Sequence, residues 1–188
     1  MPFLRLFIAL ETPQAVIPKI ASIRERLKAS EADVRWETDD KLHATIKFLG
    51  KTDDGLLPEI VSYIRGVCET KSPLLVTYKG VGCFPNSHAP RVVWVGMDDT
   101  GGRIVSLQKE IESVLTTMGF KEEGREFHPH VTLGRVKSER GVRGLLRTME
   151  SVTFESQPVE IREVALVRSD LKPDGSVYTT LKRIPLGK

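Results

Sequence analysis

Within residues 42–49, LHATIKFL, apolar and polar residues alternate strictly from Leu42 to Phe48. One face of this segment carries only apolar side chains, those of Leu42, Ala44, Ile46 and Phe48. The other face carries polar side chains, those of His43, Thr45 and Lys47. A period of two predicts a half-buried β-strand with a polar second face, which Gly50 ends.

Further segments rich in β-branched, aromatic and aliphatic residues are also predicted to be strands. They are residues 3–10, 74–81, 91–97, 127–136, 158–169 and 177–185. The tetrapeptide Lys172-Pro173-Asp174-Gly175 is typical of a turn, and it would connect the last two strands.

Four segments space their apolar residues as the buried face of a helix requires. The clearest is residues 101–119, where apolar residues recur every three or four positions before Gly119, a suitable C-terminal cap. Another helix either begins near Pro18 or is kinked there, a third follows Asp53 or Asp54 as its cap, and a weaker one covers residues 142–149. Helices mixed with half-polar strands predict an α+β protein built mainly on antiparallel sheet, and we expect one domain over residues 1–188.

The composition is that of a globular protein with a mixed surface. The 188 residues are 40% hydrophobic, which is enough to bury a core and excludes disorder as the dominant state. The net charge of +3 does not by itself make the chain a strong nucleic-acid binder. One stretch is more basic, and it is either an anion-facing patch or a solvated helix face: Arg135, Lys137, Arg140, Arg143 and Arg147.

Cysteine usage and the N-terminal segment bear on the cellular compartment. Cys68 and Cys83 lie far apart with no CxxC spacing, so neither a disulfide framework nor a zinc knuckle is indicated. The apolar stretch near the N-terminus is short and is interrupted by Arg5, which is unlike a signal peptide or a membrane span. We therefore expect a cytoplasmic protein that does not contact the membrane.

A four-residue repeat is the most informative feature of the chain: His43-Ala44-Thr45-Ile46 and His130-Val131-Thr132-Leu133. In each copy, the spacing of two residues places the imidazole and the hydroxyl on one face of a strand. A single His-x-Thr is most often an ordinary surface pair. Two matching copies would converge on one site if a pseudo-twofold relation brought their strands together.

Hydrolysis of a phosphodiester is the chemistry that such a convergence suits. The reaction needs a base for the attacking water, an acid for the departing alkoxide and donors for the nonbridging oxygens. Histidine titrates near neutral pH, so His43 and His130 can share the acid and base roles. The hydroxyls of Thr45 and Thr132 are suitable donors to the phosphate, and no metal or other cofactor is needed.

His128 and His130 flank Pro129, and this spacing could also chelate a transition metal. No cluster of Asp, Glu or Cys completes a coordination set, so we expect no metal and take His128 as a substrate-side candidate. The chain also lacks the glycine-rich phosphate loop of nucleotide triphosphatases and the Gly-x-Ser-x-Gly elbow of serine hydrolases.

With these motifs the chain resembles the 2H phosphoesterase superfamily, which is named for two His-x-Thr/Ser motifs. Within it, the chain is similar to the bacterial and archaeal RNA 2',3'-cyclic phosphodiesterases, also called 2'-5' RNA ligases. The similar blocks occur in the family's order over nearly the whole chain: Arg5–Leu10 (RLFIAL), Leu42–Gly50 (LHATIKFLG), Pro90–Gly96 (PRVVWVG), Phe127–Arg135 (FHPHVTLGR) and Tyr178–Arg183 (YTTLKR).

The resemblance implies a bilobal α+β fold with two pseudo-symmetric antiparallel sheets, helices on the outside and a central groove that carries one motif from each lobe. It also implies hydrolysis of a terminal 2',3'-cyclic phosphate of RNA to a 2'-phosphate, without metal or nucleotide cofactor. The reverse reaction, 2'-5' RNA ligation, is chemically accessible. In family terms His43 is the acid that protonates the 3'-oxygen and His130 is the base that activates water, although the residues themselves leave the opposite assignment open.

Members of this family also use an aromatic residue after the first motif and an arginine after the second, and both lie around the nucleotide. The corresponding residues are Phe48 and Arg135, which we take as substrate-binding candidates. On regular strands Phe48 would face away from His43, and Arg135 would face away from His130, so each needs a bulge or twist to reach the groove. Without one, Phe48 would pack in the core and Arg135 would form a surface ion pair.

Two other functions remain open at this point. The chain could be an RNA or nucleotide binding module that uses the paired motif as a phosphate cradle. It could also be a 2H phosphodiesterase that acts on another cyclic or 2'-5' linked phosphodiester. For the favoured function, the expected partners are RNA with a 2',3'-cyclic phosphate end or small cyclic nucleotides, and we expect a monomer.

Overall fold

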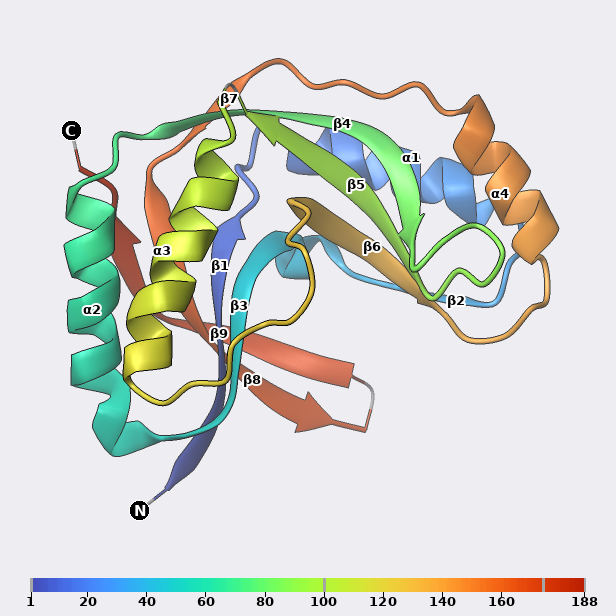
Figure 1. Ribbon diagram of the computed structural model, residues 1–188. Coiled ribbons are helices and arrows are strands. Elements are labelled where there is room, and N and C mark those ends of the chain that lie inside the picture. The colour runs from blue at the N-terminus through green and yellow to red at the C-terminus, as the bar shows by residue number, and fades with distance from the viewer. Residues whose placement is uncertain (1, 100, 174, 188) are drawn as a thin grey trace.

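Two antiparallel sheets form the framework of the computed structural model, which describes residues 2–99, 101–173 and 175–187 (Figure 1). The four-stranded sheet has the order β3 (His43–Asp53), β1 (Phe3–Glu11), β8 (Glu163–Lys172) and β9 (Gly175–Pro185). The five-stranded sheet has the order β2 (Val34–Trp36), β6 (His130–Val136), β5 (Val92–Asp99), β4 (Leu74–Phe84) and β7 (Val159–Ile161). The predicted α+β fold with two antiparallel sheets is confirmed.

Four α-helices lie on the sheets: α1 (Ile17–Lys28), α2 (Leu57–Glu69), α3 (Arg103–Thr117) and α4 (Val142–Ser151). Two short 3-10 helices, η1 (Asp39–Lys41) and η2 (Asp54–Leu56), flank β3. Helix α1 begins at Ile17, so Pro18 lies in the first turn, where its missing N–H costs no helical hydrogen bond. Helix α3 is followed by Gly119, whose φ of 88° suits the left-handed residue after a helix.

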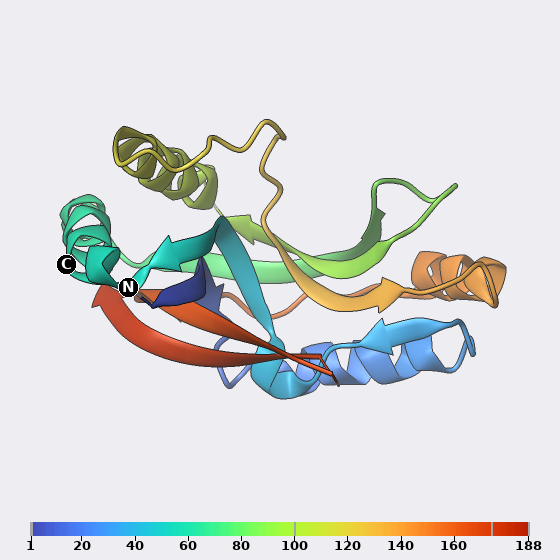
Figure 2. The same ribbon diagram turned by 90° about the horizontal axis from the view of Figure 1, so that it is seen from below.

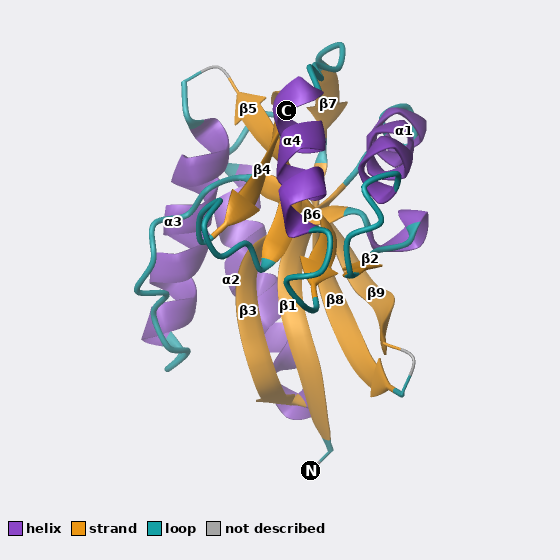
Figure 3. Cartoon of the chain, turned by 90° about the vertical axis from the view of Figure 1, so that its right-hand side faces the viewer, coloured by secondary structure: helices purple, strands orange, loops and turns teal. Residues whose placement is uncertain are grey.

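The helices are divided between the two sheets. Helix α2 contacts β9 and α3 contacts β3, so this pair covers the four-stranded sheet. Helix α4 contacts β4 and packs against α1, and Figure 2 shows these two at the opposite end of the molecule from α2 and α3. One buried apolar cluster contains residues of both sheets and all four helices. Figure 3 shows β3, β1, β8 and β9 side by side, with β3 at the edge.

Three predicted strands differ from the observed ones. Residues 158–169 form two strands rather than one, because β7 pairs with β4 whereas β8 pairs with β1, and the chain changes sheets at Arg162. Gly50 does not end the strand that follows the first motif, since β3 continues through it to Asp53. The strand of the second motif begins at His130 rather than Phe127.

Other differences are small. The three-residue strand β2 was not predicted, because so short a segment shows no period of its own. The predicted turn at residues 172–175 passes through Asp174, which lies outside the described residues. None of the described helices is long and apolar enough to cross a membrane.

Candidate active site

The two copies of the repeat lie on strands from different sheets that contact one another. His43 and Thr45 begin β3 at the edge of one sheet, and His130 and Thr132 begin β6 in the other. All four side chains are partly buried. A charge on His130 lowers the pKa of His43, so the two imidazoles lie within electrostatic reach of each other. We call these four residues the motif site.

The two imidazoles are held in the same way. Nδ1 of His43 lies 2.7 Å from the carbonyl oxygen of Lys41, and Nδ1 of His130 lies 2.6 Å from that of His128. Because a carbonyl oxygen only accepts, each Nδ1 carries the hydrogen and donates it. In the neutral ring Nε2 is then the nitrogen that can accept a proton, and in His43 it lies 3.1 Å from Oγ1 of Thr45.

Burial favours the neutral form of both rings. It lowers the pKa of His43 from 6.5 to about 4, although the hydrogen bond to Lys41 and the negative charge of Glu11 act in the opposite direction. Burial also lowers the pKa of His130, and the hydrogen bond to His128 again opposes the shift. The Arg135 guanidinium lowers both pKa values further, so at neutral pH each histidine is an uncharged potential base.

Aromatic residues from neighbouring strands enclose each imidazole. The Phe7 ring stacks on His43 with centroids 4.9 Å apart, and the Tyr178 ring meets it edge-on at 5.3 Å. Two aromatic rings also lie beside His130. The centroid of Phe84, which meets it edge-on, is 4.9 Å away, and that of Trp94 is 6.3 Å away. A Cβ at position 82 would clash with the Trp94 indole, so only glycine allows that approach.

Each motif strand contains a bulge at the same distance from its histidine. The pairing of β1 with β3 skips Ile46, and the pairing of β5 with β6 skips Leu133. A bulge inserts one residue and therefore inverts the alternation beyond it. Phe48 and Arg135, which strict alternation would have turned away, thus lie on the same face as the motif histidines.

Burial and contacts confirm this inversion for β3. The expectation that Phe48 belongs to the apolar face and Lys47 to the polar face is wrong. Phe48 is 58% exposed, and its ring centroid lies 6.1 Å from that of Phe7, the residue that stacks on His43. Lys47 is only 2% exposed and points into the protein.

The buried ammonium of Lys47 belongs to a network that holds the loop before β6. It donates to Glu112 of α3 at 2.5 Å and to the backbone carbonyl of Lys121 at 2.8 Å. The Glu112 carboxylate also accepts from the backbone N–H of Glu123 and from the side chain of Gln108. The residue after the bulge in the first motif strand therefore anchors the loop that leads to the second motif.

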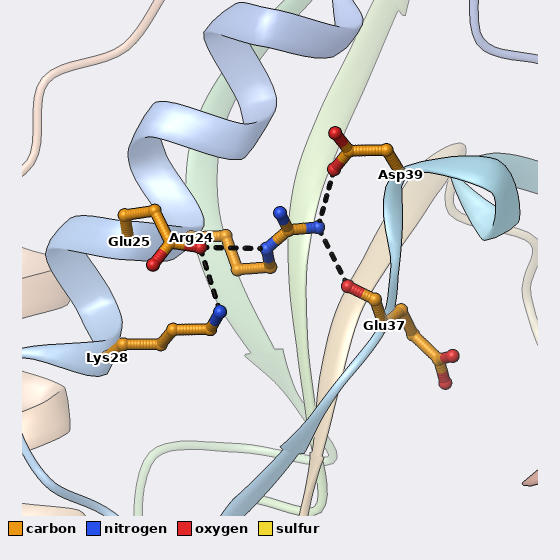
Figure 4. A network of polar contacts seen from close by, with 5 residues as sticks. All are labelled: Arg24, Glu25, Lys28, Glu37 and Asp39. Atoms are coloured by element: carbon orange, nitrogen blue, oxygen red, sulfur yellow. Dashed lines mark hydrogen bonds and ion pairs between the residues drawn. The ribbon is translucent and has the colours of Figure 1, made fainter.

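A second network anchors the segment between β2 and β3. Nη1 of Arg24 lies 2.8 Å from both the Glu37 carbonyl oxygen and the Asp39 carboxylate (Figure 4). The Glu37 carboxylate points away from Arg24 and lies 3.9 Å from Nε of Arg135. This segment continues to Lys41, whose carbonyl oxygen orients His43, so helix α1 helps to position the motif site.

Glu11 was not predicted as part of the site, yet it lies directly opposite His43 on β1. Burial opposes its ionisation, but hydrogen bonds from Arg183 and Thr180 outweigh this effect and lower the pKa of Glu11. Its charge raises the pKa of His43. The signal that could have revealed it is the alternation of β1, in which Phe7 and Glu11 share the face opposite Leu6, Ile8 and Leu10.

His128 lies next to the second motif histidine, and its ring centroid is 6.2 Å from that of Phe84. Its carbonyl oxygen accepts from His130, whereas its side chain is 60% exposed and lies 3.9 Å from Glu126. Within residues 2–99, 101–173 and 175–187, no three His, Cys, Asp or Glu side chains are grouped so that they could hold a metal ion.

Proteins with known names are similar to this chain over nearly its whole length. The sequence profile of the 2'-5' RNA ligase superfamily matches residues 12–173. A Methanothermobacter thermautotrophicus protein named RNA 2',3'-cyclic phosphodiesterase is 32% identical over 95% of this chain and 96% of its own length. Its namesake in Methanocaldococcus jannaschii is also 32% identical, over 95% and 99%.

Solved structures show the same architecture. The protein TT0787 of Thermus thermophilus has a TM-score of 0.82 at 24% identity and covers 98% of this chain and 99% of its own. E. coli LigT complexed with 3'-AMP has a TM-score of 0.72 at 27% identity and covers all of both chains.

Proposed function

This chain belongs to the 2'-5' RNA ligase superfamily, and from that membership we propose that it hydrolyses the terminal 2',3'-cyclic phosphate of RNA to a 2'-phosphate. The observation that carries the proposal is the matched presentation of His43 and His130. Both donate Nδ1–H to a backbone carbonyl, which leaves Nε2 of each ring as the basic nitrogen. The curated relatives named RNA 2',3'-cyclic phosphodiesterase support the choice of substrate.

The proposed reaction is an in-line displacement at phosphorus. His130 takes a proton from water as the oxygen attacks, and the bond between phosphorus and the 3'-oxygen breaks. His43 delivers a proton to that 3'-oxygen, so a 3'-hydroxyl and a 2'-phosphate result. The residues leave the opposite division of roles open, and both divisions need one neutral and one protonated imidazole.

The other site residues stabilise charge on the phosphate. The hydroxyls of Thr45 and Thr132 donate to its nonbridging oxygens, and Arg135 adds a positive charge on the same face. The exposed Phe48 ring is placed to contact the nucleoside. In ligation, a 5'-hydroxyl takes the place of water, gives its proton to His130 and attacks the cyclic phosphate, so a 2'-5' bond forms. The bond between phosphorus and the 3'-oxygen breaks, and His43 protonates that oxygen as in hydrolysis. Positioning of the two RNA ends is what favours that reaction over hydrolysis.

The same chain supplies every group in this scheme, which supports a monomer acting as one unit over residues 1–188. The proposed substrate and the free thiols of Cys68 and Cys83 are consistent with a cytoplasmic location. E. coli LigT, which has the same fold, has been solved with 3'-AMP, ATP and phosphate, and this supports small nucleotides as additional ligands.

Turnover of a 2',3'-cyclic mononucleotide tests the proposal. We expect product in excess of enzyme, with the 2'-phosphate as the sole isomer, and an unchanged rate in chelator. Saturable binding without product would instead support a phosphate-binding module. Faster cleavage of 2'-5' linked oligonucleotides than of cyclic-phosphate-ended RNA would favour the related 2H activity. A rate abolished by chelator and restored by a transition metal would contradict the two-histidine mechanism.

The pH dependence follows from the burial of both histidines. The fraction of free enzyme with one neutral and one protonated imidazole is greatest at a pH between the two pKa values. Both pKa values lie below 6.5. We therefore expect kcat/KM to peak on the acid side of pH 6.5 and to fall at higher pH. The phosphodiester anion favours protonated imidazole, so the kcat profile should be shifted to higher pH. A kcat/KM profile that rises above pH 7 would contradict this prediction.

A further inference from the structure

Two arginines lie directly opposite each other beside the motif site. Arg35 of β2 pairs with Arg135 of β6. Directly opposed residues of an antiparallel pair project from the same face, with Cβ atoms about 5 Å apart. On β5, Val92, Trp94 and Gly96 lie on one face of the strand. Val92 pairs with Arg135, Trp94 with Thr132 and Gly96 with His130, so these three residues of β6 share a face. Arg35 therefore extends the face of the motif site toward β2.

Of the two positive charges in this pair, only that of Arg135 has a carboxylate nearby. Like charges directly opposed across strands are destabilising unless a counter-charge is near. Glu37, with its side chain 14% exposed, lies 3.9 Å from Arg135. Asp39 is paired with Arg24 (Figure 4). In the part of the chain that the structure describes, no carboxylate lies within 4 Å of the exposed Arg35 guanidinium.

The strand register places Arg35 on the face that carries the motif site, and the electrostatics of Tyr178 agree with this placement. Glu37 raises the pKa of Tyr178, whereas Arg135 and Arg35 lower it, with burial as the largest cause of the net increase. Tyr178 is the ring that meets His43 edge-on. Tyr178 thus contacts the first histidine and lies within electrostatic reach of both Arg135 and Arg35. Among the described residues, no carboxylate lies within 4 Å of Arg35 to neutralise its positive charge.

We propose that Arg35 forms a second anion subsite, which binds the internucleotide phosphate on the 5' side of the terminal nucleoside while the motif site binds the cyclic phosphate. This inference rests on the proposed function and specifies its substrate as an RNA chain rather than a free cyclic nucleotide. A cyclic mononucleotide has no phosphate at that position. An oligonucleotide therefore gains one charge-assisted contact that the mononucleotide cannot make.

The test compares two substrates in wild type and in Arg35→Gln. One substrate is 2',3'-cyclic AMP, and the other is a tetranucleotide ending in the same cyclic phosphate. We expect wild type to prefer the tetranucleotide and Arg35→Gln to lose about tenfold in kcat/KM on it, because one phosphate contact is removed. The mononucleotide should react at an unchanged rate. The dependence of log kcat/KM on log salt for the tetranucleotide should become shallower by about 0.7.

Two further variants serve as controls. Arg35→Lys keeps a positive charge and should restore most of the preference for the tetranucleotide. Arg65→Gln removes an exposed arginine from α2, which covers the other sheet, and should change neither substrate. The melting temperature of Arg35→Gln should not fall, because the substitution relieves repulsion from Arg135.

The outcomes separate this inference from the proposed function. If Arg35→Gln slows both substrates equally, Arg35 acts at the motif site and the second subsite is wrong. If it slows neither, or if Arg65→Gln has the same effect, the inference is also wrong. If wild type hydrolyses neither substrate, the proposed function itself fails.

Discussion

Alanine at His130 or at His43 is expected to lower the turnover of a 2',3'-cyclic phosphate by about 10²-fold or more, because each removes a proton-transfer group from the transition state. The loss should appear in kcat as well as in kcat/KM, since we propose that Thr45, Thr132 and Arg135 bind the phosphate. The double variant should be little slower than either single variant, because the two groups act as a unit. Single-turnover kinetics with excess enzyme measure all three rates.

Two controls separate a chemical loss from a folding defect. His88 lies exposed in the loop between β4 and β5, and alanine there should leave the rate unchanged. Glutamine at position 43 keeps a planar polar side chain next to Phe7 and Tyr178, so it should retain the melting temperature while remaining slow. Near-wild-type turnover in both single alanine variants would reject the two-histidine mechanism.

Methionine in place of Lys47 is expected to destabilise the protein by about 3–5 kcal/mol, because it leaves the largely buried Glu112 carboxylate without its ionic partner. For a domain of this size, such a loss corresponds to a melting temperature lower by roughly 10 °C. Activity should fall more steeply with temperature than in wild type. The reason is that the lost contacts hold the loop from Lys121 to His130, which carries one of the two imidazoles. Thermal unfolding and temperature-dependent turnover check this prediction.

The double variant Lys47→Met/Glu112→Gln provides the stringent control. It removes both charges, and the glutamine oxygen can still accept from the backbone N–H of Glu123. We expect it to recover part of the stability lost in Lys47→Met. Lys79→Met breaks the exposed ion pair with Asp98 and should leave the melting temperature nearly unchanged. A double variant less stable than either single one would show that the ion pair is not the source of the effect.

Prediction from the sequence was most accurate for segments in which apolar residues are regularly spaced and form a buried face. The apolar spacing in α2 and α3 identified their buried faces, and Gly119 identified the end of α3. The duplicated His-x-Thr identified the residues that the two sheets bring together. The reason is that two residues spaced by two on a strand must project from the same face.

Prediction failed where the partner strand determines the outcome. Strict alternation assigned Lys47 to the polar face and Phe48 to the core, and a bulge opposite β1 reverses both. Residues 158–169 show one continuous strand pattern, yet they pair with β4 in one sheet and β1 in the other. Neither a bulge nor a change of sheet leaves a local signature, since both depend on the register with another strand.

The amino-acid sequence by itself therefore determined the element types, the two motifs and the face on which each imidazole and hydroxyl lie. These properties depend on backbone geometry over a few residues. Only the tertiary structure decided that Phe48 and Arg135 face the histidines, that Lys47 anchors a distant loop, and that Arg35 lies opposite Arg135. Those properties arise from pairing between segments far apart in the chain. Such contacts stabilise the protein only after the long loops between the segments have closed, that is, once both sheets have formed.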